Sequence, residues 1–322
     1  MKIRLFRTLT LIAILALAIS ACGPNSQAAP KTPLRVAWSL WPGYYPMAIA
    51  QEKGFFKAHN VEVEPVFYAV YNNQPADLAS GMVDGAMLTL SDTLFDSIHS
   101  SVKVVLVLDN SAGADQLVGA PGLTIDDLRG KRIGVQSSAI SGQLLVRQML
   151  TQAGVALTEV TLVDVPPEKV PGAIPALIDL GYTYDPFTAE ALAKGGSVLF
   201  SSADAPGLIA DVLAFRTEIT RDRPEDVKAF IAAWQEAIQV WKDNPAEGNA
   251  IIAAATGLKP EEISSVGVDL FDLAANQIAF TKAANSTSVF FTAQQESLYL
   301  AGTGDVTALA DLDFMLDPSF LK

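Results

Sequence analysis

Short apolar runs alternate with amphipathic segments along most of this chain, and this alternation limits the folds open to it. Each apolar run suits one buried strand, and the segments between the runs repeat apolar residues at helical spacing. Strands joined through helices pair in parallel, because a parallel connection needs a long crossover. The expected strands lie at 34–38, 61–66, 85–89, 103–109, 132–136, 160–163, 177–181, 197–200 and 212–216, and the expected helices include 47–59, 74–81, 91–99, 141–153 and 188–194. The sequence therefore predicts an α/β fold.

The pattern changes at residue 224, and from there onward only helices are expected. Prolines stand where first helical residues are expected, at positions 224, 245 and 260. Proline suits this position because its missing N–H would have no partner inside the helix. Trp234 and Trp241 lie on the apolar face of the expected helix 224–244. We therefore expect both tryptophans to pack in the core.

The N-terminus has the features of a secretory signal. Lys2, Arg4 and Arg7 precede an apolar run at 9–19, which is too short for a comfortable membrane span. The run ends in Ile-Ser-Ala-Cys-Gly at 19–23, which is similar to a lipobox, the motif whose cysteine receives diacylglycerol. We expect a signal peptide at 1–21, acylation of Cys22 and a polar tether at 22–32. The alternative is an ordinary export signal with an unmodified cysteine.

No repeat, low-complexity block or long linker divides the 322 residues. Two lobes are expected, with the chain leaving the first near 116–119 and returning to it near 213–217. Lobe 1 would comprise 33–116 and 214–322, and lobe 2 would comprise 117–213. The C-terminal helices would complete the first lobe and brace the hinge.

Charge and motifs exclude several classes of function. The net charge of -13 and the pI near 4.6 argue against binding to nucleic acid, whose phosphates would be repelled. Cys22 is the single cysteine, so no disulfide and no cysteine-ligated zinc site can form. His59 and His99 lie in mixed-polarity segments typical of surface or capping roles. There is no nucleophile elbow, phosphate-binding loop or zinc-protease motif. We expect no catalytic residue, metal or cofactor.

Several sequence blocks together point to a known family. WSLWPGY at 38–44 is followed by AQEKGFF at 50–56, and further blocks follow in order at 78–86, 109–115, 126–135, 178–187 and 200–209. This ordered set resembles the nitrate, sulfonate and thiamine-precursor branch of ABC-transporter solute-binding proteins. The chain departs from the family pattern where Ala176 and Leu177 replace a usual glycine, and where Leu180 replaces a small residue.

The resemblance implies a two-lobed, type II-like periplasmic-binding fold, in which each lobe has a mixed, mainly parallel sheet flanked by helices. It also implies a small-molecule ligand in the cleft between the lobes, and partners in the form of ABC permease subunits with a cytoplasmic ATPase. The lipid at Cys22 would hold the protein on the extracytoplasmic face of the cell membrane. Cytosolic thiamine-pyrimidine synthases are similar in fold and supply the enzyme alternative. They carry a cysteine-rich motif, which this chain lacks.

Four loops that follow expected strands, at 38–45, 89–92, 109–115 and 136–142, are expected to face one cleft, because ligands bind at the carboxyl ends of strands in open α/β sheets. Each serine in these loops is, taken alone, more typical of a helix cap, whereas the set is typical of a polar lining. The candidate ligand-binding residues are Trp38, Trp41, Tyr44, Thr89, Ser91, Asp92, Ser111, Asp115, Ser138, Asp179 and Tyr184.

The composition of these segments bears on the ligand. Residues 36–47, 87–95, 109–117, 136–143 and 179–187 contain no Lys, Arg or His, but they contain several aromatic and aspartate side chains. Aromatic faces stack on flat rings, and carboxylates accept hydrogen bonds from N–H or O–H groups. The composition therefore favours a small planar nitrogenous molecule. Within the branch that the chain resembles, this implies a vitamin or its precursor, with riboflavin or an aminopyrimidine favoured. Nitrate, taurine or an aliphatic sulfonate is the alternative.

Overall fold

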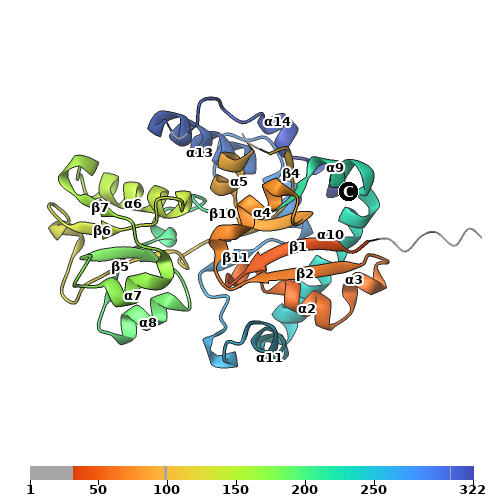
Figure 1. Ribbon diagram of the computed structural model, residues 1–322, viewed down its shortest axis with the longest axis horizontal. Helices are drawn as coiled ribbons and strands as arrows, with labels where there is room; N and C mark the ends of the chain where they lie inside the picture. Colours follow the sequence, from red (N-terminus) through yellow and green to blue (C-terminus); the bar gives the residue numbers. More distant parts are fainter. Residues whose placement is uncertain (1–31, 98–99, 305) are drawn as a thin grey trace, which may run out of the picture. The chain divides into compact units, whose positions relative to one another are not determined.

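The computed structural model describes residues 32–97, 100–304 and 306–322. The expected signal peptide, Cys22, nearly all of the expected tether and His99 lie outside the described residues. Residues Pro33–Lys322 form one unit, which is built on two β-sheets with helices packed against them (Figure 1). The expected α/β fold is confirmed.

The first sheet has six strands in the order β11-β4-β10-β3-β1-β2. These strands are β1 (Leu34–Ser39), β2 (Val63–Tyr68), β3 (Gly85–Thr89), β4 (Val102–Ser111), β10 (Ala210–Arg216) and β11 (Val268–Leu270). Strand β1 pairs in parallel with β2 and β3, whereas β10 runs antiparallel to both β3 and β4. The carboxyl ends of β1, β3 and β4 therefore meet the amino end of β10 at one edge of the sheet.

The helices that connect the parallel strands are α2 (Pro46–Glu52), α3 (Phe55–Ala58), α4 (Gln74–Ser80) and α5 (Leu90–Asp96). The single helix expected at 47–59 is divided into α2 and α3. The division falls at Gly54, whose φ of 72° is left-handed. A residue without a Cβ adopts this conformation readily and ends the regular helical turn.

The second sheet has five strands in the order β7-β6-β8-β5-β9. Its elements are β5 (Gln116–Gly119), β6 (Arg132–Gly134), α6 (Ile140–Gln152), β7 (Thr161–Val163), α7 (Val170–Ala173), β8 (Leu180–Thr183), α8 (Phe187–Ala193) and β9 (Ser197–Ser201). Strand β6 pairs in parallel with β7 and β8, and β5 pairs antiparallel with β8 and β9. Each sheet is thus mixed, as expected.

The chain passes between the sheets after β4 and again after β9. These positions differ from the crossovers expected near 116–119 and 213–217. Residues 116–119 are strand β5 of the second sheet, which is too short to show an apolar alternation. Residues 210–213 belong to the first sheet because β10 begins at Ala210, before the apolar run that predicted it.

The C-terminal region contains α9 (Thr217–Asp222), α10 (Pro224–Asp243), α11 (Pro245–Thr256), α12 (Leu273–Ala279), α13 (Val289–Thr303) and α14 (Leu312–Met315). Pro224 and Pro245 begin helices as expected, and Pro260 begins a single 3₁₀ turn. Trp234 and Trp241 are buried in the core, as predicted. The helices-only expectation is wrong at β11, a strand too short to give a periodic pattern.

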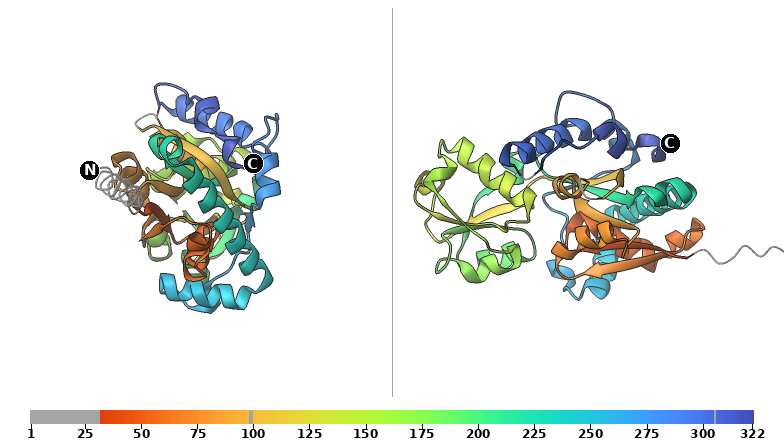
Figure 2. Two further views of the ribbon diagram at one scale, coloured as in Figure 1. Left: turned by 90° about the vertical axis from the view of Figure 1, so that its right-hand side faces the viewer. Right: turned by 45° about the horizontal axis from the view of Figure 1, so that its top comes forward.

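Helix α13 contacts one helix packed on the first sheet and one helix packed on the second sheet (Figure 2). It packs along α5 of the first sheet. Its Tyr299 hydroxyl accepts a hydrogen bond from Arg147 Nε of α6 at 2.7 Å, and the Arg147 guanidinium carbon lies 5.1 Å from the centre of the tyrosine ring. The C-terminal segment therefore links the two sheets.

None of the described helices is both long and apolar enough to cross a bilayer.

Candidate functional site

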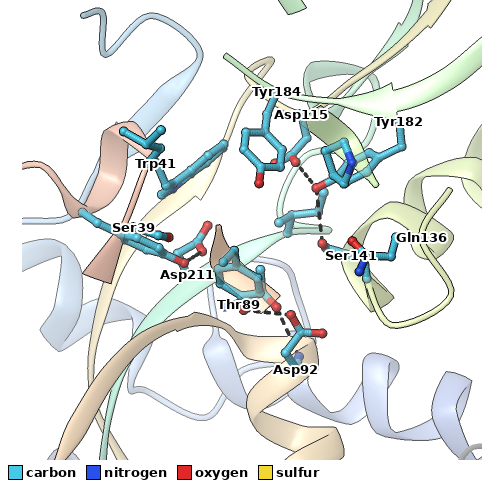
Figure 3. Close-up of a pocket in the computed structure, with 16 residues that line it drawn as sticks. Ser39, Trp41, Thr89, Asp92, Asp115, Gln136, Ser141, Tyr182, Tyr184 and Asp211 are labelled. Atoms are coloured by element: carbon cyan, nitrogen blue, oxygen red, sulfur yellow. Dashed lines mark hydrogen bonds between the residues drawn. The ribbon is translucent and has the colours of Figure 1, made fainter. Parts of the chain in front are cut away.

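A cavity of about 50 Å³ is lined by residues of both sheets, at the edge where strands β1 and β3 end and β10 begins (Figure 3). The lining residues are Ser39, Leu40, Trp41, Tyr44, Tyr71, Thr89, Asp92, Asp115, Gln136, Ala139, Ser141, Pro167, Tyr182, Tyr184, Ile209 and Asp211. Each of the four loops expected to face one cleft contributes to this lining.

The structure brings together in this lining Trp41, Tyr44, Thr89, Asp92, Asp115 and Tyr184 from the candidate residues. All of them lie at or just beyond the end of a strand, or where the chain crosses between the sheets. Their placement follows from strand direction, since parallel strands present their carboxyl ends at the same edge.

Four other candidates lie outside the lining. Trp38 is 3% exposed and packs in the core, with its ring centroid 4.9 Å from that of Phe67. Ser91 is buried beside Thr89, and its hydroxyl lies 3.2 Å from the Thr89 hydroxyl. Ser111 supports the site from behind, because its hydroxyl accepts the backbone N–H of Asp115 at 3.1 Å. Ser138 is exposed in the loop before α6.

Asp179, which the sequence predicted to bind the ligand, also lies outside the lining. The strand was expected at 177–181 but begins at Leu180, so Asp179 precedes β8 and the cavity lies beyond its other end. Its carboxylate accepts a hydrogen bond from Arg132 Nη2 at 2.9 Å, and Arg132 holds the pKa of Asp179 below its usual value. This aspartate forms an ion pair within the second sheet.

Each carboxylate of the lining accepts a hydrogen bond from a tyrosine hydroxyl. The pairs are Tyr71 with Asp92, Tyr44 with Asp211, and Tyr182 with Asp115. Asp92 also accepts the backbone N–H of Ile140, the first residue of α6. These hydrogen bonds hold the carboxylates in defined positions around the cavity (Figure 3).

Asp109 lies directly behind the lining, at the end of β4, and is fully buried. The indole N–H of Trp41 donates to it, with Nε1 at 3.3 Å from Oδ1 and 3.2 Å from Oδ2. The Trp41 ring meets the Tyr184 ring edge-on, with centroids 5.9 Å apart. A Cβ at Gly43 would lie 1.7 Å from Asp109 Oδ2, so this close contact requires glycine.

Burial controls the protonation of these groups. It raises the pKa of Asp115 to about 6 and also raises the pKa of Asp92. The pKa values of Asp109 and Asp211 are raised well above the usual value, first by burial and then by the negative charge of neighbouring carboxylates. The lining contains no Lys, Arg or His. The cavity is therefore acidic and aromatic, and suits a ligand that brings N–H donors or positive charge.

Sequence reasoning missed several lining residues. Asp211 was missed because it begins an antiparallel strand, and the rule of carboxyl ends does not apply to such a strand. Tyr71 lies between β2 and α4, in a segment with no apolar pattern, yet its hydroxyl accepts the Thr89 backbone N–H at 3.0 Å. Gln136 and Tyr182 stand within the segments considered but were not selected. An aspartate directly before the apolar run of β10 is the signal that could have identified Asp211.

No cluster of three or more His, Cys, Asp or Glu side chains placed to hold a metal ion occurs in the described residues. His59 was expected to have a surface or capping role. In the structure its Nε2 lies 2.7 Å from Glu236 Oε1, in a partly exposed pair.

Comparison of the sequence finds relatives among curated proteins. A candidate binding protein of Brucella abortus is 28% identical over 242 residues, which cover 71% of this chain and 73% of that protein. A candidate thiamine biosynthesis protein of Haemophilus influenzae is 25% identical over 243 residues, covering 73% of this chain and 76% of that protein.

Solved structures share the fold at low sequence identity. The periplasmic aliphatic sulphonate binding protein SsuA from Escherichia coli is similar with a TM-score of 0.73 and 17% identity, covering 89% of this chain and 92% of SsuA. The desulfurization enzyme DSZB is similar with a TM-score of 0.65 and 16% identity, covering 90% of this chain and 98% of DSZB. The two-sheet α/β architecture is thus that of a periplasmic binding protein.

A family model described as NMT1/THI5 like matches residues 41–248, a range that includes most of the cavity lining and the whole second sheet. This range exceeds half of the chain, and the protein belongs to the NMT1/THI5-like family.

Proposed function

We propose that this protein is the extracytoplasmic solute-binding component of an ABC importer, and that it captures one small molecule in the cavity between its two sheets. Its family membership, its binding-protein relatives and the fold that it shares with SsuA support this proposal. The ligand would be released to permease subunits in the membrane, which a cytoplasmic ATPase drives.

The proposed ligand is a compact, flat molecule with N–H donors or a positive charge, such as an aminopyrimidine vitamin precursor. One observation carries this choice: the lining combines Tyr and Trp rings with three aspartates and no basic residue. An anion such as nitrate or a sulfonate would be held next to these carboxylates with no cation to offset the repulsion.

The size of the cavity also favours a compact ligand. Its volume of about 50 Å³ is far below the range of roughly 300–1,000 Å³ found for pockets that hold drug-sized molecules. A single substituted ring is a better candidate than the three fused rings of riboflavin, and the comparisons give no support for riboflavin.

The protein would act at the cell membrane through lipid at Cys22. The motivation is the lipobox-like block at 19–23, which lies outside the described residues.

An enzyme is the alternative function, because the fold of DSZB is similar. A cysteine nucleophile is unavailable in the described fold, since Cys22 is the single cysteine of the chain. Turnover of a bound heterocycle would support the enzyme alternative.

Three probes of nearly equal shape test the ligand class: benzamidinium, which is cationic, benzamide, which is neutral, and benzenesulfonate, which is anionic. We expect calorimetry to show tightest binding for benzamidinium and none for benzenesulfonate. An aminopyrimidine, riboflavin, taurine and nitrate complete the panel. Tight binding of nitrate, taurine or benzenesulfonate without binding of benzamidinium would reject the ligand class and leave the importer role standing.

Two aspartate variants locate the binding. Asp115→Asn should weaken benzamidinium about tenfold or more, because a charge-assisted hydrogen bond contributes about 1.5–3 kcal/mol. The same change should affect benzamide much less. Asp179→Asn is the matched control and should leave the affinity unchanged, since Asp179 pairs with Arg132 away from the cavity. Equal losses in both variants would contradict the proposed site.

A further inference from the structure

Asp211 in the cavity lining and Asp109 directly behind the lining are buried carboxyl groups on neighbouring strands. Strands β4 and β10 are antiparallel, and Asp211 is directly paired with Asp109 in their register. Side chains of directly paired residues point to the same face of a sheet, with Cβ atoms about 4.5–5.5 Å apart. Asp109 is 0% exposed and Asp211 is 2% exposed, so water does not screen one from the other.

The surroundings supply donors but no positive charge. Trp41 donates to Asp109 from the loop after β1, and Tyr44 donates to Asp211 from the same loop. The other titratable groups near the pair are three carboxyls and one tyrosine, namely Asp92 of α5, Asp115 before β5, Asp269 of β11, and Tyr184 after β8. Neither Asp109 nor Asp211 belongs to any of the ion pairs seen in the described part of the chain.

We propose that Asp109 and Asp211 share one proton in the empty cavity, and that a cationic ligand bound beside Asp211 expels this proton to solvent. Two ionised carboxylates side by side in a buried site would repel each other strongly, and a shared proton removes this repulsion. A hydrogen bond between the two carboxyls is consistent with such sharing. Asp109, which does not line the cavity, would therefore set the charge that the cavity presents.

This inference rests on the proposed function, because it assumes a cationic ligand. Binding exchanges one positive charge for another, because the cationic ligand enters and the proton leaves. The summed charge of the two carboxyl groups and the cation beside them therefore stays the same. The affinity for a permanently charged ligand should then fall as the pH falls, by up to tenfold per pH unit where the empty pair holds the proton. Burial and mutual repulsion raise the pKa values of both groups, which places this range above that of ordinary carboxyls.

The shared proton can be tested in ligand-free protein by infrared spectroscopy at neutral pH. The signal is the C=O stretch of protonated carboxyl groups, compared among the wild type, Asp109→Asn, Asp211→Asn and the double variant. If the pair shares one proton, the double variant loses the signal of one protonated carboxyl, and the losses in the two single variants do not add up to that loss. If the two carboxyls are protonated independently, the losses add, and if both are ionised no signal is lost. Either of these results would overturn the proposal.

Glu296 is another buried carboxyl with a raised pKa, and any signal from it is common to the four proteins and cancels in these differences. Asp179→Asn is the matched control. It makes the same chemical change at an aspartate that pairs with Arg132 away from the cavity and has a lowered pKa, so the signal should stay unchanged.

Proton release is tested by calorimetry with benzamidinium, which stays charged throughout the pH range used. Titrations at about pH 7.5 in buffers of different ionisation enthalpy give the number of protons released, and Asp115, with a pKa of about 6, contributes little there. We expect close to one proton per benzamidinium in the wild type and in Asp179→Asn, and none in Asp109→Asn. Binding without proton release, or equal release in Asp109→Asn, would overturn the coupling.

The two failures are distinguishable. If benzamidinium does not bind while the infrared result shows a shared proton, the proposed ligand class fails and the coupling fails with it, but the carboxyl pair stands. If benzamidinium binds and the infrared losses add, the proposed function stands and the shared proton is rejected.

Discussion

The pairing of each lining aspartate with a tyrosine hydroxyl has an energetic consequence. A buried carboxylate loses its hydration, and one neutral hydrogen bond replaces only part of it. The empty cavity therefore contains acidic groups that are fixed in place and whose lost hydration is only partly replaced. A ligand with positive charge or N–H donors would supply the missing interactions, so under the proposed function we expect it to bind more tightly than a molecule of the same shape that lacks both.

Gly43 is predicted to be essential for the geometry of this site. In Gly43→Ala the new methyl would lie 1.7 Å from Asp109 Oδ2 and 2.7 Å from Trp41 Nε1, so the Trp41–Asp109 hydrogen bond must break or shift. Overpacking of this kind lowers the free energy of unfolding by about 1–3 kcal/mol. Urea denaturation should show this loss, and calorimetry should show weaker binding of benzamidinium.

The control for this substitution is Gly172→Ala in α7. A Cβ at Gly172 meets no atom within 4 Å, so the variant should be as stable as the wild type or slightly more stable. Wild-type stability and affinity in Gly43→Ala would show that the contact with Asp109 is not needed.

At the scale of elements, α13 carries a buried acid where it packs against α5. Glu296 is 3% exposed, and its Oε2 has no hydrogen-bond partner among the described residues. Burial raises its pKa well above the usual value, and the nearby charge of Asp92 raises it further. A neutral glutamic acid is the form that this position accommodates.

Glu296→Gln is therefore predicted to change how stability depends on pH. The folded protein keeps the Glu296 proton at pH values where the unfolded chain has released it. The free energy of unfolding then falls as the pH rises above the ordinary pKa of 4.5, by about 1.4 kcal/mol per pH unit until the raised pKa is reached. The glutamine variant lacks this contribution, so its stability should fall less as the pH rises above 4.5.

Denaturation curves at several pH values measure this difference. Other buried acids, Asp109 and Asp211 among them, give the same sign in both proteins, so the difference isolates Glu296. The exposed Glu261→Gln is the control, and its curve should run parallel to that of the wild type. Parallel curves for Glu296→Gln as well would mean that Glu296 is ionised in the folded protein.

At the scale of the whole molecule, the cavity depends on two sheets that the chain joins by two crossings, with α13 in contact with helices of both. Asp92 of α5 accepts the first N–H of α6, and Arg147 of α6 donates to Tyr299 of α13. These contacts fix the position of α6, whose first turn contributes Ser141 to the lining. The site is therefore a property of both sheets together.

The cellular attachment of the molecule is predicted from the N-terminal residues. Cys22→Ala should release the protein from membranes without changing its fold, because each acyl methylene buried in lipid contributes roughly 0.8 kcal/mol of membrane affinity. Membrane fractionation and mass spectrometry of the intact protein provide the measurement, with Ser26→Ala as a control in the same segment. Soluble wild-type protein with an unmodified thiol would contradict the prediction.

The sequence by itself determined the α/β class, the positions of most strands and the loops that meet at the cavity. These features follow from local patterns, since strand and helix periodicity and the direction of parallel strands are set by residues close together in the chain. Trp41, Asp92 and Asp115 could be found in this way because each lies at or beyond the end of a predicted strand or at a crossing. The absence of basic residues from the lining was also visible in the sequence.

The tertiary structure alone decided which side chains face one another. Asp211 reaches the cavity because β10 is inserted antiparallel between β3 and β4, and strand order is not encoded in any local pattern. The start of β8 lies three residues later than predicted, so Asp179 lies beside Arg132 instead of at the cavity. Trp38 points to the core because successive residues of a strand point to opposite faces. Burial, which fixes the protonation of Asp109 and Asp211, exists only once both sheets have packed, because desolvation depends on every neighbour that excludes water.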